Sequence, residues 1–245
     1  MGVQVPLLAF SLPMRQDLPP PRRPTAGLSL VAATAAVYSA LVVVAVGWGL
    51  LDGFRNIWVH PGHELSRTHL LRHTSWGALA GIALGLLVVG ASRALTALSG
   101  WGKRLHMEFH AVLRGLSWWD AFVIALFSAL GEEALFRGAM QPTVGLWITA
   151  AAFGVMHAPV RRALWPWPLL AFAMGLAFGV LYRVSGDLAG PVLAHFTINF
   201  LNLGHIARTR YEGFESADPA PPLAKAPAPP DEAPASPRSD PSETP

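Results

Sequence analysis

The chain has 245 residues, of which 52% are hydrophobic and 13% charged, and its formal net charge is +3 at pH 7. Soluble domains carry about 25% charged residues, so this composition excludes an ordinary soluble globule, a wholly disordered chain and a collagen-like chain. The sequence contains no cysteine, which excludes disulfides, thiol nucleophiles and zinc–thiolate sites. We therefore predict an all-α, polytopic integral membrane protein. Nucleic acid is not an expected partner, because the cations are spread over short loops, where Lys and Arg set membrane topology.

Both ends of the chain are predicted to lie outside the folded part. Residues 1–26 are rich in proline, which interrupts helices, and are predicted to form a mobile N-terminal arm. Residues 208–245 are rich in Pro, Ala, Ser and acidic residues, a composition typical of a disordered, solvated tail.

About six transmembrane helices are predicted between these ends, because about 20 apolar residues suffice to cross a bilayer. Two fall in an N-terminal part, residues 27–100, and four in a second membrane domain, residues 101–207. Residues 102–116 have the pattern of an amphipathic segment at the membrane interface. The predicted spans are, in chain order, about Leu28–Leu51, Trp76–Leu98, Trp118–Met140, Thr143–His157, Trp165–Arg183 and Leu188–Ile206.

Two further patterns concern packing and orientation. Gly77, Gly81 and Gly85 recur every fourth residue, which predicts one helix face in close contact with another helix. With the N-terminus inside, ten Lys and Arg fall in inside segments and four in outside loops, which predicts that both termini are cytoplasmic.

Two adjacent carboxylates, Glu132 and Glu133, lie in the third predicted span, where a charge costs several kcal/mol. Glu133 and Arg137 are four residues apart, so they share a helix face and can pair. Glu132 lies about 100° round the helix from Glu133. Glu132 is therefore the carboxyl group whose proton affinity its surroundings can adjust, which suits a general base. The alternative is a buried ion pair that only holds helices together, which leaves the second carboxylate unexplained.

Three more polar residues lie in later spans. His157 ends the fourth span, where a histidine can be simply a polar residue at a helix end. His195 and Asn199 are four apart on one helix face, where they could stabilise an oxyanion, hold a water molecule or hydrogen-bond another helix. Taken together with Glu132, these residues form the parts of an acyl-hydrolysis site in which water attacks.

These residues fall in three motifs, in order and in separate predicted spans. Glu132–Arg137 reads EEALFR, Phe153–His157 reads FGVMH and His195–Asn199 reads HFTIN. Over about residues 116–205 the chain thereby resembles the CPBP family, which includes the type II CAAX prenyl endopeptidases and the Abi-like bacteriocin-processing membrane proteases. The resemblance implies an intramembrane endopeptidase of the bacterial inner membrane that acts on a membrane-associated or prenylated peptide.

The resemblance also implies roles for the motif residues. Glu132 resembles the general base and His157 its partner in activating water. His195 and Asn199 resemble the pair that stabilises the oxyanion, and Glu133 and Arg137 the supporting pair. No cofactor is favoured, but zinc remains an alternative with Glu132, His157 and His195 as its ligands and water in the open position.

Several alternatives remain open from the sequence. The chain could be a non-catalytic membrane scaffold or immunity-type protein, or a proton-coupled transporter, which uses the same residue types. The expected partners are a peptide or protein substrate and the lipid bilayer, and no oligomeric state is predicted. Counted from the predicted helix ends, Glu132 and His195 lie nearer the outer face than His157, so a tilted or broken helix is needed to join them.

Overall fold

A computed structural model describes residues 25–53, 56–63, 67–158 and 165–209. The chain divides into two units, residues 1–209 and 210–245, and the described residues all belong to the first. The two predicted arms, residues 1–26 and 208–245, therefore fall almost wholly outside the described residues, and their disorder stays a prediction. The helices are α1 (Thr25–Leu51), α2 (Arg67–Leu98), α3 (Gly100–Leu113), α4 (Trp118–Glu133), the π-helix η1 (Ala134–Met140), α5 (Gln141–Val144), α6 (Leu146–Met156), α7 (Pro166–Ser185) and α8 (Ala189–Ile206).

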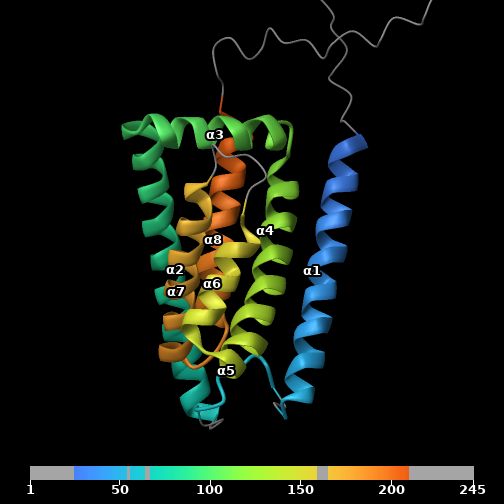
Figure 1. Cartoon of the computed structure of the whole chain (residues 1–245), viewed down its shortest axis with the longest axis vertical. Helices are drawn as coiled ribbons and strands as arrows, with labels where there is room; N and C mark the ends of the chain where they lie inside the picture. The colour runs from blue at the N-terminus through green and yellow to red at the C-terminus, as the bar shows by residue number, and fades with distance from the viewer. Residues whose placement is uncertain (1–24, 54–55, 64–66, 159–164, 210–245) are drawn as a thin grey trace, which may run out of the picture. The chain divides into compact units, whose positions relative to one another are not determined.

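The fold class is all-α, as predicted (Figure 1). Among the described residues, the one β feature is an isolated bridge between Val59 and Asp187. It joins the segment after α1 to the turn between α7 and α8, where Leu188 N also donates to Trp58 O at 3.0 Å. The loop that follows α1 is thus fixed to the start of the helix that carries His195.

The number of membrane spans agrees only roughly with the six predicted. Within the described part of the chain, three helices are long and apolar enough to cross a bilayer: Leu30–Leu51, His73–Leu98 and Pro166–Ser185. A fourth candidate is the bent pair of α3 with residues 118–144. Of the other predicted spans, Trp118–Met140 became α4 with η1, inside this bent pair, and Leu188–Ile206 became α8; these two helices carry the polar side chains of the first and third motifs.

The remaining predicted span, Thr143–His157, is shorter than expected. Gly145, with φ 86°, separates α5 from α6, and α6 has 11 residues. At 1.5 Å per residue it is about 16 Å long, about half the hydrocarbon thickness of a bilayer. His157 directly follows the last residue of α6, so this histidine lies partway along the bundle rather than at its far end. The short helix thereby removes the conflict in height between His157 and Glu132.

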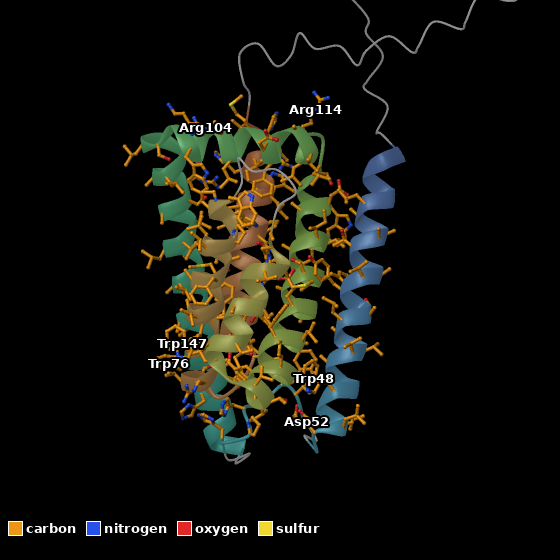
Figure 2. The ribbon with its side chains drawn as sticks, viewed as in Figure 1. Trp48, Asp52, Trp76, Arg104, Arg114 and Trp147 are labelled. Carbon is orange, nitrogen blue, oxygen red and sulfur yellow. The ribbon has the colours of Figure 1, made fainter. Side chains whose placement is uncertain are left out.

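The predicted interfacial segment forms α3, which lies across one end of the other helices (Figure 1). The axis turns by 106° between α3 and residues 118–144. Leu105, His106 and His110 are buried against the bundle, whereas Arg104 is exposed at the end opposite Trp76 and Trp147 (Figure 2). Trp101 on α3 and Trp118 and Trp119 at the start of α4 add aromatic side chains at the Arg104 end, and aromatic belts at both ends are typical of a membrane-spanning protein.

The glycine pattern in α2 marks its contact with α8, as predicted. A Cβ at Gly81 would lie 2.1 Å from Gly190 O, and one at Gly85 would lie 2.7 Å from Thr197 Cβ. Because these distances are shorter than any van der Waals contact, only glycine permits this approach of the two backbones. The contact fixes α8, and with it His195, against a long apolar span.

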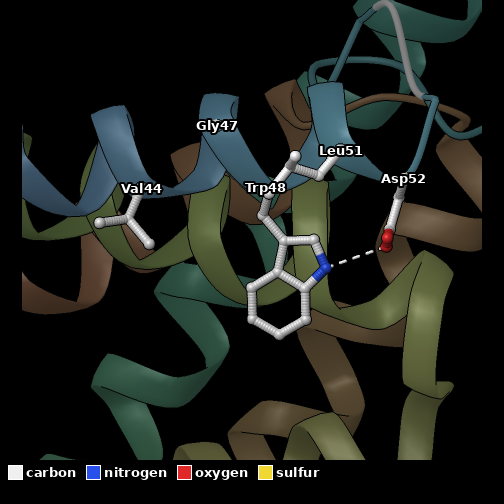
Figure 3. A pocket seen from close by; sticks show the side chains of 5 residues that line it. All are labelled: Val44, Gly47, Trp48, Leu51 and Asp52. Carbon is white, nitrogen blue, oxygen red and sulfur yellow. Dashed lines mark hydrogen bonds between the residues drawn. The ribbon is translucent and has the colours of Figure 1, made fainter.

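The end of α1 is anchored to η1 and α5. Trp48 Nε1 donates to Asp52 Oδ2 at 2.9 Å (Figure 3). The Thr143 hydroxyl of α5 donates to the same oxygen. The hollow drawn in Figure 3 is lined by residues of the last turns of α1 only, and Asp52, already hydrogen-bonded, is its single acidic side chain. We therefore interpret this hollow as part of the helix anchor.

Candidate active site

The polar residues of the three motifs gather at one place inside the bundle. α4 and η1 supply the two glutamates and the arginine, the residue after α6 supplies one histidine, and α8 supplies the other histidine and the asparagine. Four of them are buried, with exposed fractions of 0 to 8%, a depth at which charged groups need partners. The residues of the cluster are Glu132, Glu133, Arg137, His157, His195 and Asn199.

Glu133 is held by two donors from different helices. Arg137 Nη1 lies 3.0 Å from Glu133 Oε1, which is the pair expected from their spacing, and His195 Nδ1 lies 2.7 Å from the same oxygen. Arg137 also donates from Nη2 to Gly175 O at 3.3 Å, and its Cζ lies 4.4 Å from the centre of the Phe153 ring. The carboxylate therefore links α4, η1, α7 and α8 through charge-assisted hydrogen bonds.

A π-helix begins directly after the two glutamates, where the sequence predicted a continuous α-helix. The Gln141 N–H bonds back to Phe136 O, five residues earlier, as π-helices require. Such segments concentrate at functional sites because the extra residue changes which side chains face inward. Here the π-helix contains Arg137 and leads into Gln141, both buried against α7.

Glu132 faces both histidines. Its Oε2 lies 3.9 Å from His157 Nε2 and 3.9 Å from His195 Nε2, and this oxygen has no hydrogen-bond partner among the described residues. Glu133, its neighbour in sequence, also has an Oε2 without a partner among the described residues, but its Oε1 is bonded to both Arg137 and His195. The two carboxylates thus have different surroundings, and only Glu132 presents an oxygen to both imidazole rings.

The partners of the two histidines fix which ring nitrogen carries hydrogen. His157 Nδ1 lies 2.8 Å from Phe153 O, a carbonyl oxygen that can only accept, so Nδ1 is the donor. His195 Nδ1 faces Glu133 Oε1, which as a carboxylate oxygen also accepts. In both rings the other nitrogen, Nε2, is the atom that faces Glu132. The difference between the rings is that His157 bonds a neutral carbonyl and His195 an anion.

Asn199 is oriented by a residue that the motifs do not include. Its Nδ2 donates to Ser128 Oγ at 3.0 Å, which leaves the second N–H of the amide for another acceptor. Ser128 is buried one turn before Glu132 on α4. This four-residue spacing is the sequence signal from which Ser128 could have been found.

A cavity of about 370 Å³ adjoins the cluster. His157, His195 and Asn199 line it, and Glu132 lies behind the two imidazoles rather than on the wall. Most of the remaining wall is aliphatic or aromatic, from α2, α3, α7 and α8, and the cavity extends to the inner side of α3. Its size and lining suit an apolar ligand whose one polar segment meets the histidines.

The donor set does not have the spacing of a zinc site. Two ligands about 2.0–2.1 Å from a tetrahedral zinc are about 3.3 Å apart, shorter than the 3.9 Å from Glu132 Oε2 to either Nε2. Over the described part of the chain, no group of three or more His, Cys, Asp or Glu side chains could hold a metal ion. We therefore assign no step of the chemistry to a metal.

Comparisons with known proteins identify the segment that carries this cluster. Residues 114–201 match the family described as type II CAAX prenyl endopeptidase Rce1-like. The chain is also 32% identical over 96 residues to the uncharacterized protein YpbD of Bacillus subtilis, an alignment that covers 36% of this chain and 49% of that protein. The chain thus spans about half the length of this curated relative, and no solved structure matches it. The family resemblance predicted from the three motifs is confirmed over this segment.

Proposed function

We propose that the chain is an intramembrane endopeptidase of the CAAX type that hydrolyses a peptide bond with water activated by Glu132 and His157. The observation that carries the proposal is the position of Glu132 Oε2, 3.9 Å from both Nε2 atoms beside a largely apolar cavity. Support also comes from the matched segment, residues 114–201, which contains all six residues of the cluster.

The distance between Glu132 and His157 suits a shared water molecule. At 3.9 Å the two atoms are too far apart for a direct hydrogen bond, whereas one water can bond both at about 2.8 Å. Glu132 takes a proton from this water as its oxygen attacks the carbonyl carbon of the substrate. His157, with hydrogen at Nδ1, accepts the other O–H at Nε2 and orients the water.

The second histidine and the asparagine suit the negative charge that develops on the carbonyl oxygen. His195 bonds the Glu133 anion through Nδ1, and in its protonated form it presents an N–H at Nε2. Asn199 presents the N–H that Ser128 does not use. Preorganised donors of this kind supply a large share of the rate enhancement in acyl transfer. The proton on Glu132 then passes to the leaving amine, and the peptide bond breaks into a carboxylic acid and an amine.

Glu133 and Arg137 have a supporting role in this proposal. They do not line the cavity, and their contacts run to His195 and to the backbone of α7. Their charge and position hold His195 with its Nε2 toward the reacting atoms, as outer partners of active-site histidines do.

The lining of the cavity and the hydropathy of the chain support a proposal for the substrate and its setting. The largely apolar wall of the cavity fits a membrane-associated or prenylated peptide or protein. We propose that the protein lies in a bacterial inner membrane with both termini cytoplasmic and needs no metal cofactor. Nucleic acid has no place in this proposal.

A reconstituted system with a broad peptide library tests the activity while the substrate is unidentified. Full-length protein in lipid nanodiscs is incubated with a library of membrane-anchored peptides, and the products are identified by mass spectrometry. Wild type is expected to produce matched pairs of new carboxyl and amino termini, and Glu132→Gln to produce none. Equal product from both proteins would contradict the role of Glu132. A scaffold or transporter would give no product from either.

A further inference from the structure

Tyr38 brings α1 into contact with the candidate base. This residue lies near the middle of α1, half-buried, and its hydroxyl lies within electrostatic reach of the Glu132 carboxylate. α1 lies outside residues 114–201, the segment that matches the protease family. None of the three motifs points to it, and the contact connects parts of the chain far apart in sequence.

The backbone geometry fixes this contact. A Cβ at Gly131 would lie 2.7 Å from Tyr38 O, 2.9 Å from Tyr38 Cβ and 3.0 Å from Tyr38 Cδ1. α1 and α4 therefore meet at the residue before Glu132, at a distance that only glycine allows. The tyrosine ring packs against this glycine, so its position relative to Glu132 does not depend on side-chain contacts alone.

A hydrogen bond from the Tyr38 hydroxyl would act directly on the orientation of Glu132. A hydroxyl inside a spanning helix is costly unless it bonds, and a carboxylate oxygen is a strong acceptor for it. Tyr38 of α1 packs on Gly131, the residue before Glu132, while Glu132 Oε2 faces His157 and His195 at 3.9 Å. Without a contact from the Tyr38 hydroxyl, the Glu132 carboxylate could rotate and turn its oxygens away from the two imidazoles.

We propose that Tyr38 is a positioning residue of the active site, whose hydroxyl holds the Glu132 carboxylate so that Oε2 faces the two histidines. The hydrolytic unit then includes α1 as well as the matched segment. Tyr38 does not line the cavity, so it acts through Glu132 and not on the substrate. This inference rests on the proposed role of Glu132 as the base.

Infrared spectroscopy tests the contact without a substrate. The difference spectrum between wild type and Glu132→Gln isolates the carboxyl bands of Glu132, and the same difference is taken in the Tyr38→Phe background. The matched control is Tyr182→Phe, because the buried Tyr182 hydroxyl has no hydrogen-bond partner among the described residues. The Glu132 bands are expected to shift in Tyr38→Phe and to keep their positions in Tyr182→Phe. Identical bands in Tyr38→Phe and wild type would overturn the proposal.

Kinetics on a cleaved peptide separate positioning from a purely structural role. Tyr38→Phe is expected to lower kcat about tenfold, the effect of one lost hydrogen bond, with KM unchanged. Gly131→Ala should lower kcat in the same direction, since it moves Tyr38 without removing the hydroxyl. A changed KM with an unchanged kcat would contradict the proposal. Shifted Glu132 bands in a protein whose wild type cleaves nothing would instead contradict the proposed function and leave the contact itself in place.

Discussion

His195 Nδ1 lies 2.7 Å from Glu133 Oε1, so the second glutamate of the motif holds the histidine of another helix. The spacing in sequence predicted only that Glu133 pairs with Arg137. In the structure, the same oxygen serves both residues, and the Phe178 ring stacks on His195 at 5.5 Å. Glu133 therefore connects the charge of Arg137 to the orientation of the proposed oxyanion donor.

Removal of one member of the buried pair should destabilise the protein strongly. Arg137→Met leaves the Glu133 anion without its guanidinium, which is expected to cost about 3–5 kcal/mol of unfolding free energy. The double variant Arg137→Met/Glu133→Gln should lose less than the sum of the two single changes. Equilibrium unfolding in mixed detergent micelles measures these differences. Arg104→Met, on the exposed side of α3, is the control and should change stability little; a similar loss there would contradict the assignment.

The two asparagines of α8 provide a test of the oxyanion donor. Asn199 and Asn202 both line the cavity, but only Asn199 is proposed to touch the reacting oxygen. Asn199→Ala is expected to lower kcat about 10²–10³-fold, as loss of one oxyanion donor does, and Asn202→Ala to leave kcat nearly unchanged. Ser128→Ala should lower kcat less than Asn199→Ala and add little to it in the double variant. Equal losses for the two asparagine variants would show that Asn199 has no special role.

Close packing between α2 and α8 can be tested with two glycines of the same helix. A Cβ at Gly81 would meet Gly190 O at 2.1 Å, whereas one at Gly90 would meet nothing within 4 Å. Gly81→Ala should therefore lower the unfolding free energy by about 1–3 kcal/mol through overpacking. Gly90→Ala should leave it unchanged or raise it by up to about 1 kcal/mol, because alanine favours the helix. Thermal unfolding in detergent measures both; a stable Gly81→Ala would contradict the contact.

Chelation tests the metal-free mechanism. Because the spacing of 3.9 Å between Glu132 Oε2 and each Nε2 is too wide for a zinc site, activity in nanodiscs is expected to persist in excess chelator. A zinc protease treated in parallel shows that the chelator works. Loss of cleavage that zinc restores, together with stoichiometric zinc by elemental analysis, would make the protein a metalloenzyme.

The residues of the polar cluster could be recognised in the sequence because the patterns that mark them are local. Charged residues are rare in apolar helices, and four-residue spacings place Glu133 with Arg137 and His195 with Asn199 on shared faces. The glycine face of α2 was predicted for the same reason, since a periodic pattern determines one side of a helix.

The features that the sequence did not predict depend on contacts between distant segments. The apolar pattern continues to His157, so it predicted a full span where α6 has 11 residues after the turn at Gly145. The π-helix has no distinct hydrophobic period, and the sequence predicted an α-helix through it. The link between Tyr38 and Glu132 joins two helices whose relative register only tertiary packing sets.

A comparison of protein termini in the host tests most directly whether this chain cleaves peptide bonds through Glu132. One strain carries the wild-type chain and the other Glu132→Gln, at equal abundance in the membrane and with equal thermal stability of the purified proteins. New amino and carboxyl termini of membrane-associated proteins are expected only with wild type, and they name the substrate. Identical termini in the two strains across growth conditions would contradict such cleavage and favour a non-catalytic membrane protein.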